Sequence, residues 1–248
     1  MAREGMTILA VVPARGGSKG IVRKNLRHVG GLSLVARAAK LAAELAWIDH
    51  AVLSTDDDEI AAEGRNHGLD VPFMRPPELA ADNALSVDMW RHAWLASEDH
   101  YAMRFDASVL LEPTSPLRQP GDVERTIDAL IAGNHKAAAT ISRSSAHHTP
   151  HKTLTVDDDG RIGFFLPRGA DHSLRQSVPA CYHRNGLCYA ATRSTLIDDG
   201  HIIEDDCVAV VIERPVVNID EPFDLEMAEF LVGRGPDASR AGVREGRT

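Results

Sequence analysis

An apolar run followed at once by a glycine-rich, basic loop constrains this chain more than any other feature. Residues 8–12 are typical of a buried strand, and Pro13 with the glycines at 16 and 17 prevents that strand from continuing. Four cations then fall within ten residues, at Arg15, Lys19, Arg23 and Lys24. Glycines let backbone N–H groups approach an anion, and loops that follow parallel strands lie where open α/β sheets bind ligands. The segment therefore predicts a phosphate-binding loop.

The same loop also fits an ordinary solvated turn whose cations are surface charges. Two standard phosphate motifs are absent: Lys19 comes only three residues after Gly16 and is followed by Gly20, which breaks G-x-x-x-x-G-K-[ST], and there is no G-x-G-x-x-G. The chain as a whole is acidic, with a formal net charge of -9. A concentrated group of cations in an acidic protein favours an anionic partner.

Strand-like and helix-like segments alternate along the chain, which predicts a layered α/β fold with a mostly parallel central sheet. Strands are expected at residues 8–12, 50–54, 108–111, 137–141, 187–191 and 207–213. Helices are expected at residues 33–46, 56–68, 87–96, 120–131 and 222–231. Residues 143–182 break the alternation and predict an inserted β-hairpin with an acidic turn.

Length and composition favour one globular enzyme domain. The 248 residues, 44% of them hydrophobic, predict a single domain over residues 1–232 and a disordered tail over residues 233–248. We expect neither a signal peptide nor a membrane span, because no apolar run approaches about 20 residues. Three cysteines without C-x-x-C spacing fit a reduced, cytoplasmic protein. The acidic balance argues against a nucleic-acid-binding face.

Residues 14–25 match the pattern Ala-Arg-x-Gly-Ser-Lys-Gly-Ile-x-x-Lys-Asn. This segment resembles the N-terminal signature of the acylneuraminate cytidylyltransferases, which make CMP-sialic acids and related CMP-activated acids. The resemblance implies a three-layer nucleotide-diphospho-sugar transferase-like fold with a small protruding dimerisation subdomain at 143–182. It also implies a homodimeric enzyme that uses CTP and Mg2+. The nucleotide-binding residues that it implies are Ala14, Arg15, Gly16, Gly17, Ser18, Lys19, Lys24, Asn25, Arg75 and Ser86.

Within that set, Arg75 and Ser86 correspond to the family's base-reading segment. By resemblance they face the cytosine, and an arginine with a hydroxyl suits a pyrimidine edge that carries carbonyl and ring-nitrogen acceptors. Taken alone, Arg75 also fits an ordinary surface residue, and Asp56 an ordinary helix N-cap.

The acceptor-binding residues implied by the resemblance are Glu112, Arg175, Gln176 and Tyr189. Glu112 follows a predicted central strand, at the sheet end where ligands bind. The family has glutamine at this position, and glutamate cannot donate an amide N–H. Arg175 suits the acceptor's acidic group, because guanidinium forms paired hydrogen bonds with carboxylates and phosphonates.

The block Asn218-Ile219-Asp220 follows a late predicted strand. The family has Asp-x-Asp here, with both carboxylates holding Mg2+ against the CTP phosphates. Alternate positions of an extended strand point to the same side. The amide oxygen of Asn218 can still bind a hard cation but supplies no charge, so Asp220 is the favoured metal ligand. The predicted catalytic residues are Arg15, Lys19, Lys24 and Asp220.

These observations favour a CTP-dependent cytidylyltransferase that joins CMP to an acidic acceptor and releases pyrophosphate. A nonulosonic sugar acid is the first expectation for the acceptor. Glu112 and Asn218 shift some weight to a small phosphonate, whose oxygen is already ionised and needs no base. Two other classes stay open, a dinucleotide-binding module with Asp56 on a ribose and an inactive dimeric binding protein.

Overall fold

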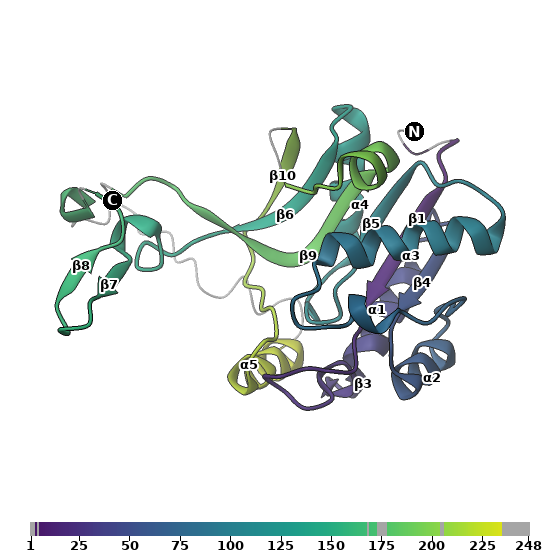
Figure 1. Cartoon of the computed structure of the whole chain (residues 1–248), viewed down its shortest axis with the longest axis horizontal. Coiled ribbons are helices and arrows are strands. Elements are labelled where there is room, and N and C mark those ends of the chain that lie inside the picture. The colour runs from purple at the N-terminus through teal and green to yellow at the C-terminus, as the bar shows by residue number, and fades with distance from the viewer. Residues whose placement is uncertain (1–2, 4, 168, 173–177, 204–205, 235–248) are drawn as a thin grey trace. The chain divides into compact units, whose positions relative to one another are not determined.

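The computed structural model describes residues 3, 5–167, 169–172, 178–203 and 206–234 (Figure 1). The chain forms two compact units. The first comprises Met1–Thr140, Asn185–Val210 and Arg214–Thr248, and the second comprises Ile141–Arg184 and Val211–Glu213. Residues 235–248 of the predicted tail lie outside the described residues. No helix in the described part of the chain has the combined length and apolarity that a membrane crossing needs.

A six-stranded sheet runs in the order β10-β6-β9-β5-β1-β4. Its strands are β1 (Ile8–Pro13), β4 (His50–Ser54), β5 (Ala107–Leu110), β6 (Ala137–Arg143), β9 (Tyr182–Thr192) and β10 (Cys207–Ile212). Strand β1 pairs in parallel with both β4 and β5, whereas β9 is antiparallel to β5. The predicted α/β class with a mostly parallel sheet is confirmed.

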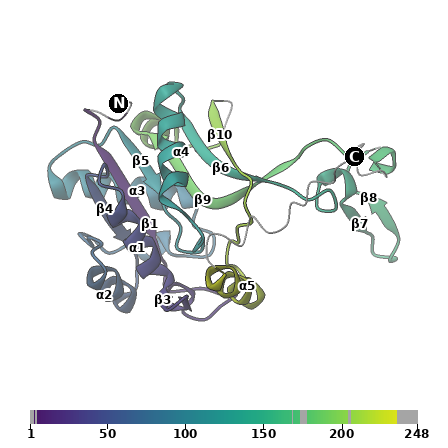
Figure 2. The same cartoon turned by 180° about the vertical axis from the view of Figure 1, so that it is seen from behind.

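Helices cover both faces of this sheet (Figures 1 and 2). They are α1 (Leu34–Glu44), α2 (Asp58–Asn66), α3 (Ser86–Tyr101) and α4 (Pro120–Ala132), whereas α5 (Pro222–Gly233) packs in a separate core with Val29, Leu34 and Ile219. Alternate residues of β1 enter different cores: Ile8, Ala10 and Val12 pack with α1, α2 and α4, while Leu9 and Val11 pack with Met89, Trp90 and Trp94 of α3. The fully apolar β1 sequence thus fits a central strand that is buried on both sides.

Most predicted elements are present, although several bounds differ and some short elements were not predicted. Helix α3 continues to Tyr101, and β9 begins at Tyr182, before the predicted start at residue 187. A two-residue pair, β2 (His28–Val29) with β3 (Leu32–Ser33), was not predicted, because strands this short carry no readable periodicity. Ser33 caps α1 as predicted, since its hydroxyl accepts from the Ala36 N–H at 3.0 Å.

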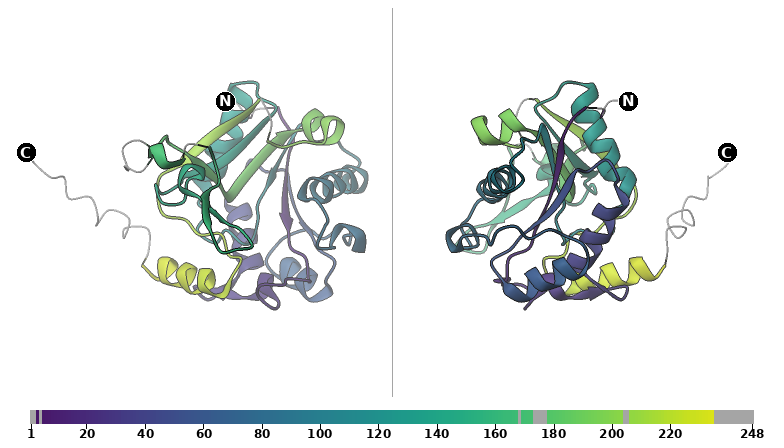
Figure 3. Two further views of the ribbon diagram at one scale, coloured as in Figure 1. Left: turned by 60° about the vertical axis from the view of Figure 1, so that its left-hand side comes forward. Right: turned by 90° about the vertical axis from the view of Figure 1, so that its right-hand side faces the viewer.

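The second unit contains the hairpin expected within residues 143–182. Strands β7 (Leu154–Val156) and β8 (Ile162–Phe164) pair antiparallel. Asp157 closes the acidic turn by accepting from the N–H groups of Asp159 and Arg161. Large apolar side chains of this unit are exposed, namely Leu154, Val156, Ile162, Phe164, Phe165 and Tyr182. The left view of Figure 3 shows the hairpin from a further direction.

Candidate active site

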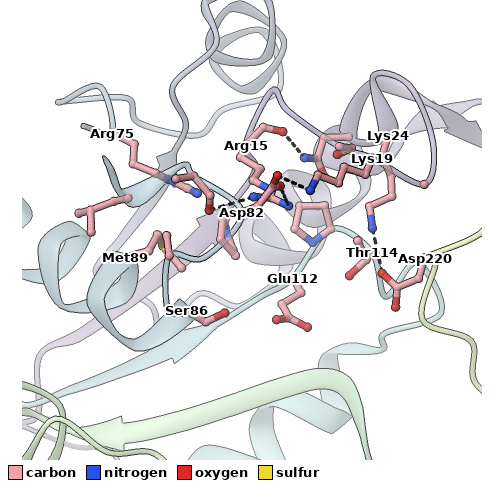
Figure 4. Close-up of a pocket in the computed structure, with 18 of the residues that line it drawn as sticks. Arg15, Lys19, Lys24, Arg75, Asp82, Ser86, Met89, Glu112, Thr114 and Asp220 are labelled. Atoms are coloured by element: carbon pink, nitrogen blue, oxygen red, sulfur yellow. Dashed lines mark hydrogen bonds and ion pairs between the residues drawn. The ribbon is translucent and has the colours of Figure 1, made fainter. Parts of the chain in front are cut away.

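A cavity of about 440 Å³ opens in the first unit, beyond the carboxyl ends of β1 and β5. Many predicted site residues line it together: Arg15, Ser18, Lys19, Lys24, Asn25, Arg75, Ser86, Glu112, Asn218 and Asp220. They come from segments far apart in the sequence, and Figure 4 shows several of them around the cavity. Such a position is where parallel α/β sheets bind ligands.

The loop after β1 is held closed by its own polar groups. The side-chain amide of Asn25 donates to the carbonyl of Arg15 at 2.9 Å, and Asn25 is only 5% exposed. The loop is anchored to the sheet where the Ala14 N–H donates to the Ser54 carbonyl at 2.9 Å. Asn25 therefore fixes the loop's shape as well as lining the cavity.

Three cations converge on the cavity and are paired with two carboxylates (Figure 4). Asp82 contacts Lys19 Nζ at 2.6 Å and Arg15 Nη2 at 3.2 Å. Lys24 Nζ donates to Asp220 Oδ1 at 3.0 Å and to the Ile219 carbonyl at 2.8 Å. The hydrogen bond from Lys19 holds the pKa of Asp82 below its usual range. An incoming phosphate would therefore compete with Asp82 for Lys19 and Arg15.

Part of the loop faces away from the cavity. Ala14 is buried, and Gly16 uses its N–H to donate to Asp56 Oδ1 at 2.9 Å. Neither residue lines the cavity, nor does Gly17. Arg23, one of the four clustered cations, pairs with Asp57 and Glu59. The predicted anion cradle thus consists of side chains more than of the amides at positions 16 and 17.

Arg75 forms a rigid part of the cavity wall. Its Nε donates to Ser54 Oγ at 3.1 Å and its Nη2 to the Ser54 carbonyl at 2.5 Å. Burial lowers its pKa to about 10, while nearby Asp56 acts in the opposite direction. The guanidinium therefore stays charged at neutral pH. Ser86, the first residue of α3, lines the same cavity.

The predicted acceptor residues are placed differently from one another. Glu112 lines the cavity, but Tyr189 is 8% exposed and packs in the α3-side core, where it pairs with Leu110 of β5. Tyr189 is not among the cavity-lining residues. Arg175 and Gln176 lie outside the described residues.

Several cavity residues were not predicted as site residues. Leu85 and Met89 lie beside Ser86 at the start of α3, and the three-residue spacing from Ser86 to Met89 on a helix could have indicated the latter. Thr114 lies two residues after Glu112. Asp82 belongs to a segment without regular structure, so no periodicity pointed to its contacts with Lys19 and Arg15.

The site offers few protein ligands for a metal ion. In the part of the chain that the structure describes, no group of three or more His, Cys, Asp or Glu side chains is arranged to hold one. Asp220 and Asn218 supply oxygen atoms at the cavity. This sparse oxygen set fits Mg2+, which commonly takes one or two protein ligands and completes its shell with phosphates and water.

Comparisons with known proteins find matches that cover most of the chain. The family model described as cytidylyltransferase matches residues 9–166. A CMP-N,N'-diacetyllegionaminic acid synthase of Campylobacter jejuni is 29% identical over 226 residues, 91% of this chain and 94% of the relative. A pseudaminic acid cytidylyltransferase of the same species is 26% identical over 227 residues, 91% and 96% of the two chains.

Solved structures show the same fold. A CMP:2-keto-3-deoxy-manno-octonic acid synthetase complexed with CTP has a TM-score of 0.67 and 18% identity to this chain. The match covers 92% of this chain and 99% of that one. At this level of identity the likeness concerns the fold.

Proposed function

The chain belongs to the cytidylyltransferase family, and on that premise we propose that it transfers CMP from CTP to a nonulosonic sugar acid and releases pyrophosphate. The observation that carries the proposal is the convergence of Arg15, Lys19 and Lys24 on one cavity beyond the sheet. Cations gathered there can bind the negatively charged phosphates of a nucleoside triphosphate in place of Asp82. The relatives named for legionaminic and pseudaminic acid support a sugar acid over a phosphonate as the acceptor.

At the nucleotide end, Arg15, Lys19 and Lys24 neutralise the phosphates. Ser18 and Asn25 contribute to the same loop, and Ala14, Gly16 and Gly17 support its backbone. Arg75 and Ser86 face the cytosine in this proposal. Because Ser54 fixes the Arg75 guanidinium, base recognition costs little ordering of that side chain.

In the reaction, an acceptor hydroxyl oxygen forms a bond to the α-phosphorus while the bond from that phosphorus to the bridging oxygen breaks. Pyrophosphate leaves with the electron pair, and the hydroxyl proton passes to solvent or a base. Such transfers depend on positioning and charge stabilisation more than on covalent participation by the protein. Arg15, Lys19 and Lys24 supply fixed positive charge, and Asp220 orients Lys24.

We propose Mg2+ as the cofactor, held by Asp220 and the amide oxygen of Asn218. When bound, it would neutralise charge on the transferring phosphates. Lys24 already contacts Asp220 Oδ1, which fixes the direction in which this carboxylate points.

The acceptor end of the cavity contains Glu112. The family pattern supports acceptor-binding roles for Arg175, Gln176 and Tyr189. The burial of Tyr189 supports an indirect role, in which its packing against β5 holds the sheet end in place. Arg175 remains our candidate for the acceptor's carboxylate.

We also propose a homodimer formed through the second unit. Exposed Val156 and Ile162 are 69% and 70% accessible, and they pair across the β7–β8 hairpin. A two-stranded hairpin with apolar exposed side chains gains stability when a partner covers it. The double variant V156D/I162D should then be monomeric in sedimentation velocity, whereas the unaltered protein should sediment as a dimer. A monomeric unaltered protein at micromolar concentration would remove this proposal.

The decisive experiment measures pyrophosphate release with CTP and Mg2+ across a panel of acceptors. The panel contains N-acetylneuraminic, legionaminic and pseudaminic acids, together with small phosphonates. We expect release with at least one sugar acid, and little with ATP, GTP or UTP. Turnover with phosphonates alone would overturn the acceptor assignment. A protein that binds CTP without turning over any acceptor would instead be a binding protein.

A further inference from the structure

Two departures from the family pattern meet at one glycine. A β-carbon built on Gly186 would lie 2.9 Å from Glu112 Oε2 and 3.2 Å from Asn218 Nδ2. Ser115 Oγ would also lie 2.9 Å from it. Glu112 and Asn218 are far apart in the sequence, yet both line the cavity. Figure 4 shows Glu112 there. The functional groups of Glu112 and Asn218 are therefore neighbours around a single point.

Hydrogen bonds to backbone groups hold Glu112, Gly186 and Asn218 close together. Buried Arg118 donates through Nη2 to the Glu112 carbonyl at 2.6 Å and to the Gly186 carbonyl at 3.3 Å. The Ile219 N–H donates to the Thr114 carbonyl at 2.8 Å. The three segments that carry Glu112, Gly186 and Asn218 are thus tied together by hydrogen bonds that do not use the functional side chains. The backbone positions of Glu112 and Asn218 relative to each other are therefore fixed.

The resemblance described above implies an amide at position 112 and a carboxylate at position 218, and this chain has the reverse. Taken one at a time, the two differences look like the loss of an amide donor and the loss of a charge. Because both groups surround Gly186, the cavity keeps one carboxylate and one amide. The net charge of this part of the cavity is the same under both arrangements.

We infer that Glu112 and Asn218 act as one exchanged pair that recognises the acceptor acid. In this pair, Asn218 Nδ2 donates to the acceptor's carboxylate and Glu112 accepts from an acceptor hydroxyl. The inference rests on the proposed function and deepens it by naming what sets acceptor specificity. The Asn218 amide has two ends, so its oxygen remains able to bind Mg2+ while its nitrogen serves the acceptor.

This pairing also selects against a small phosphonate. A fully ionised phosphonate group has hydrogen-bond acceptors only, so the adjacent Glu112 carboxylate would meet like charge and find no donor on that group. A sugar acid carries hydroxyl donors beside its carboxylate and satisfies both members of the pair. A site built to hydrogen-bond a substrate group rejects analogues that lack that group strongly.

Four proteins test the inference: the unaltered chain, E112Q, N218D and the double variant E112Q/N218D. All the changes are nearly isosteric, and thermal unfolding of each protein checks that it folds. We expect each single variant to lose about thirtyfold in kcat/KM for the sugar acid, on the scale of one unpaired polar group. The double variant restores one carboxylate and one amide, so it should recover to within about threefold of the unaltered chain.

Binding gives a second readout that does not depend on turnover. Calorimetric titration of E112Q with CTP and Mg2+ should give the same Kd as the unaltered chain, because Glu112 serves the acceptor. Titration with N,N'-diacetyllegionaminic acid, in the presence of a non-hydrolysable CTP analogue, should show the same loss and recovery across the four proteins.

The outcomes separate the pair from the proposed function. If the double variant loses as much as both single losses multiplied together, the two residues act independently and the inference is wrong. Normal acceptor kcat/KM in E112Q also overturns it. If the unaltered chain binds the acid but releases no pyrophosphate, the proposed function fails, and the binding series alone decides on the pair. If no protein of the series binds the acid, both fail.

Discussion

The two ends of the cavity are lined by different kinds of side chain. At the phosphate end, Arg15, Lys19 and Lys24 are long cationic side chains that already contact Asp82, Asp220 or backbone carbonyls. At the acceptor end, Glu112 and Asn218 surround a glycine at short range. In the function that we propose, the first end acts through the charge of several cations. The second acts through hydrogen bonds between matched donors and acceptors.

This difference indicates at which positions such an enzyme can tolerate substitutions. Every nucleoside triphosphate presents the same phosphates, so the phosphate end needs only sufficient positive charge in place. The acceptor end must distinguish among acids, and discrimination requires donors and acceptors matched one to one. An exchange of carboxylate and amide is possible there, because it conserves the set of groups while changing which segment carries each.

The largest expected effect is at the phosphate end. Lys24→Ala removes a cation from the cavity and also frees Asp220 from its 3.0 Å contact. We expect kcat to fall by about a hundredfold to a thousandfold, the scale of losing one preorganised charge contact. Steady-state pyrophosphate release measures it. Near-normal kcat in the variant would show that Lys24 has no catalytic role and that the two ends differ less than we argue.

The grouping of Arg15, Lys19 and Lys24 around one cavity could be predicted from sequence because these residues are local. Strand, glycines and cations lie within eighteen residues, from Ile8 to Asn25, so their spacing alone indicated the site. What the spacing could not give was which groups point inward. The N–H of Gly16 donates to Asp56, and the Arg23 side chain pairs with Asp57. Both partners come from the segment after β4, whose position depends on strand pairing.

The acceptor end could be predicted only in part, because it is assembled from three distant segments. Sequence comparison with the family pattern identified Glu112 and Asn218 one at a time. Their proximity follows from the ties that Arg118 and the Ile219 N–H make between segments, and no local pattern encodes those. Tyr189 shows the same limit: the strand was predicted, but the face on which its side chain packs depends on the sheet's register.

The next largest effect tests the contact between the loop after β1 and the segment that carries Asp220. A β-carbon on Gly20 would lie 2.3 Å from the Asp220 carbonyl oxygen, which is backbone and cannot swing away. We expect Gly20→Ala to lower kcat/KM for CTP by about a hundredfold, because it separates the loop from Asp220.

Gly17→Ala is the matched control for this change. A β-carbon on Gly17 would meet no atom within 4 Å, so this variant should keep nearly full activity. Equal losses in the two variants would mean that loop flexibility matters, and that contact with Asp220 does not.

A smaller effect is expected from crowding the acceptor end. Gly186 has a φ of +70°, and a methyl group there would press on Glu112, Ser115 and Asn218. We expect Gly186→Ala to destabilise the fold by about 1–2 kcal/mol through backbone strain. It should also lower kcat/KM for the acceptor by about tenfold, through displacement of the pair. The Kd for CTP should not change.

Gly200→Ala separates strain from crowding. Gly200 has a φ of +73° with no atom within 4 Å of a built β-carbon, so its substitution brings similar strain and no contact with the cavity. Thermal unfolding should show comparable losses in both variants, while only Gly186→Ala should impair the acceptor. If both variants leave acceptor kinetics intact, Gly186 is needed for its backbone conformation alone.

The smallest effect concerns Asp82, the carboxylate that occupies Lys19 and Arg15 before CTP arrives. Asp82→Asn removes this competitor, so we expect the Kd for CTP to fall by about threefold at low salt and by less at high salt, as for an exposed ion pair. Calorimetric titration at two salt concentrations measures both values.

The hydrogen bond from Lys19 lowers the pKa of Asp82. The stability that ionised Asp82 contributes is therefore present above the pKa of this carboxyl in the unfolded state. It is lost as the pH falls through the lower pKa of Asp82 in the folded state. Without CTP, the unaltered chain should exceed Asp82→Asn in thermal stability at neutral pH, and the difference should vanish in acid. Weaker CTP binding in the variant would instead make Asp82 a residue that positions Lys19 for the phosphates, and the phosphate end would then depend on geometry as the acceptor end does.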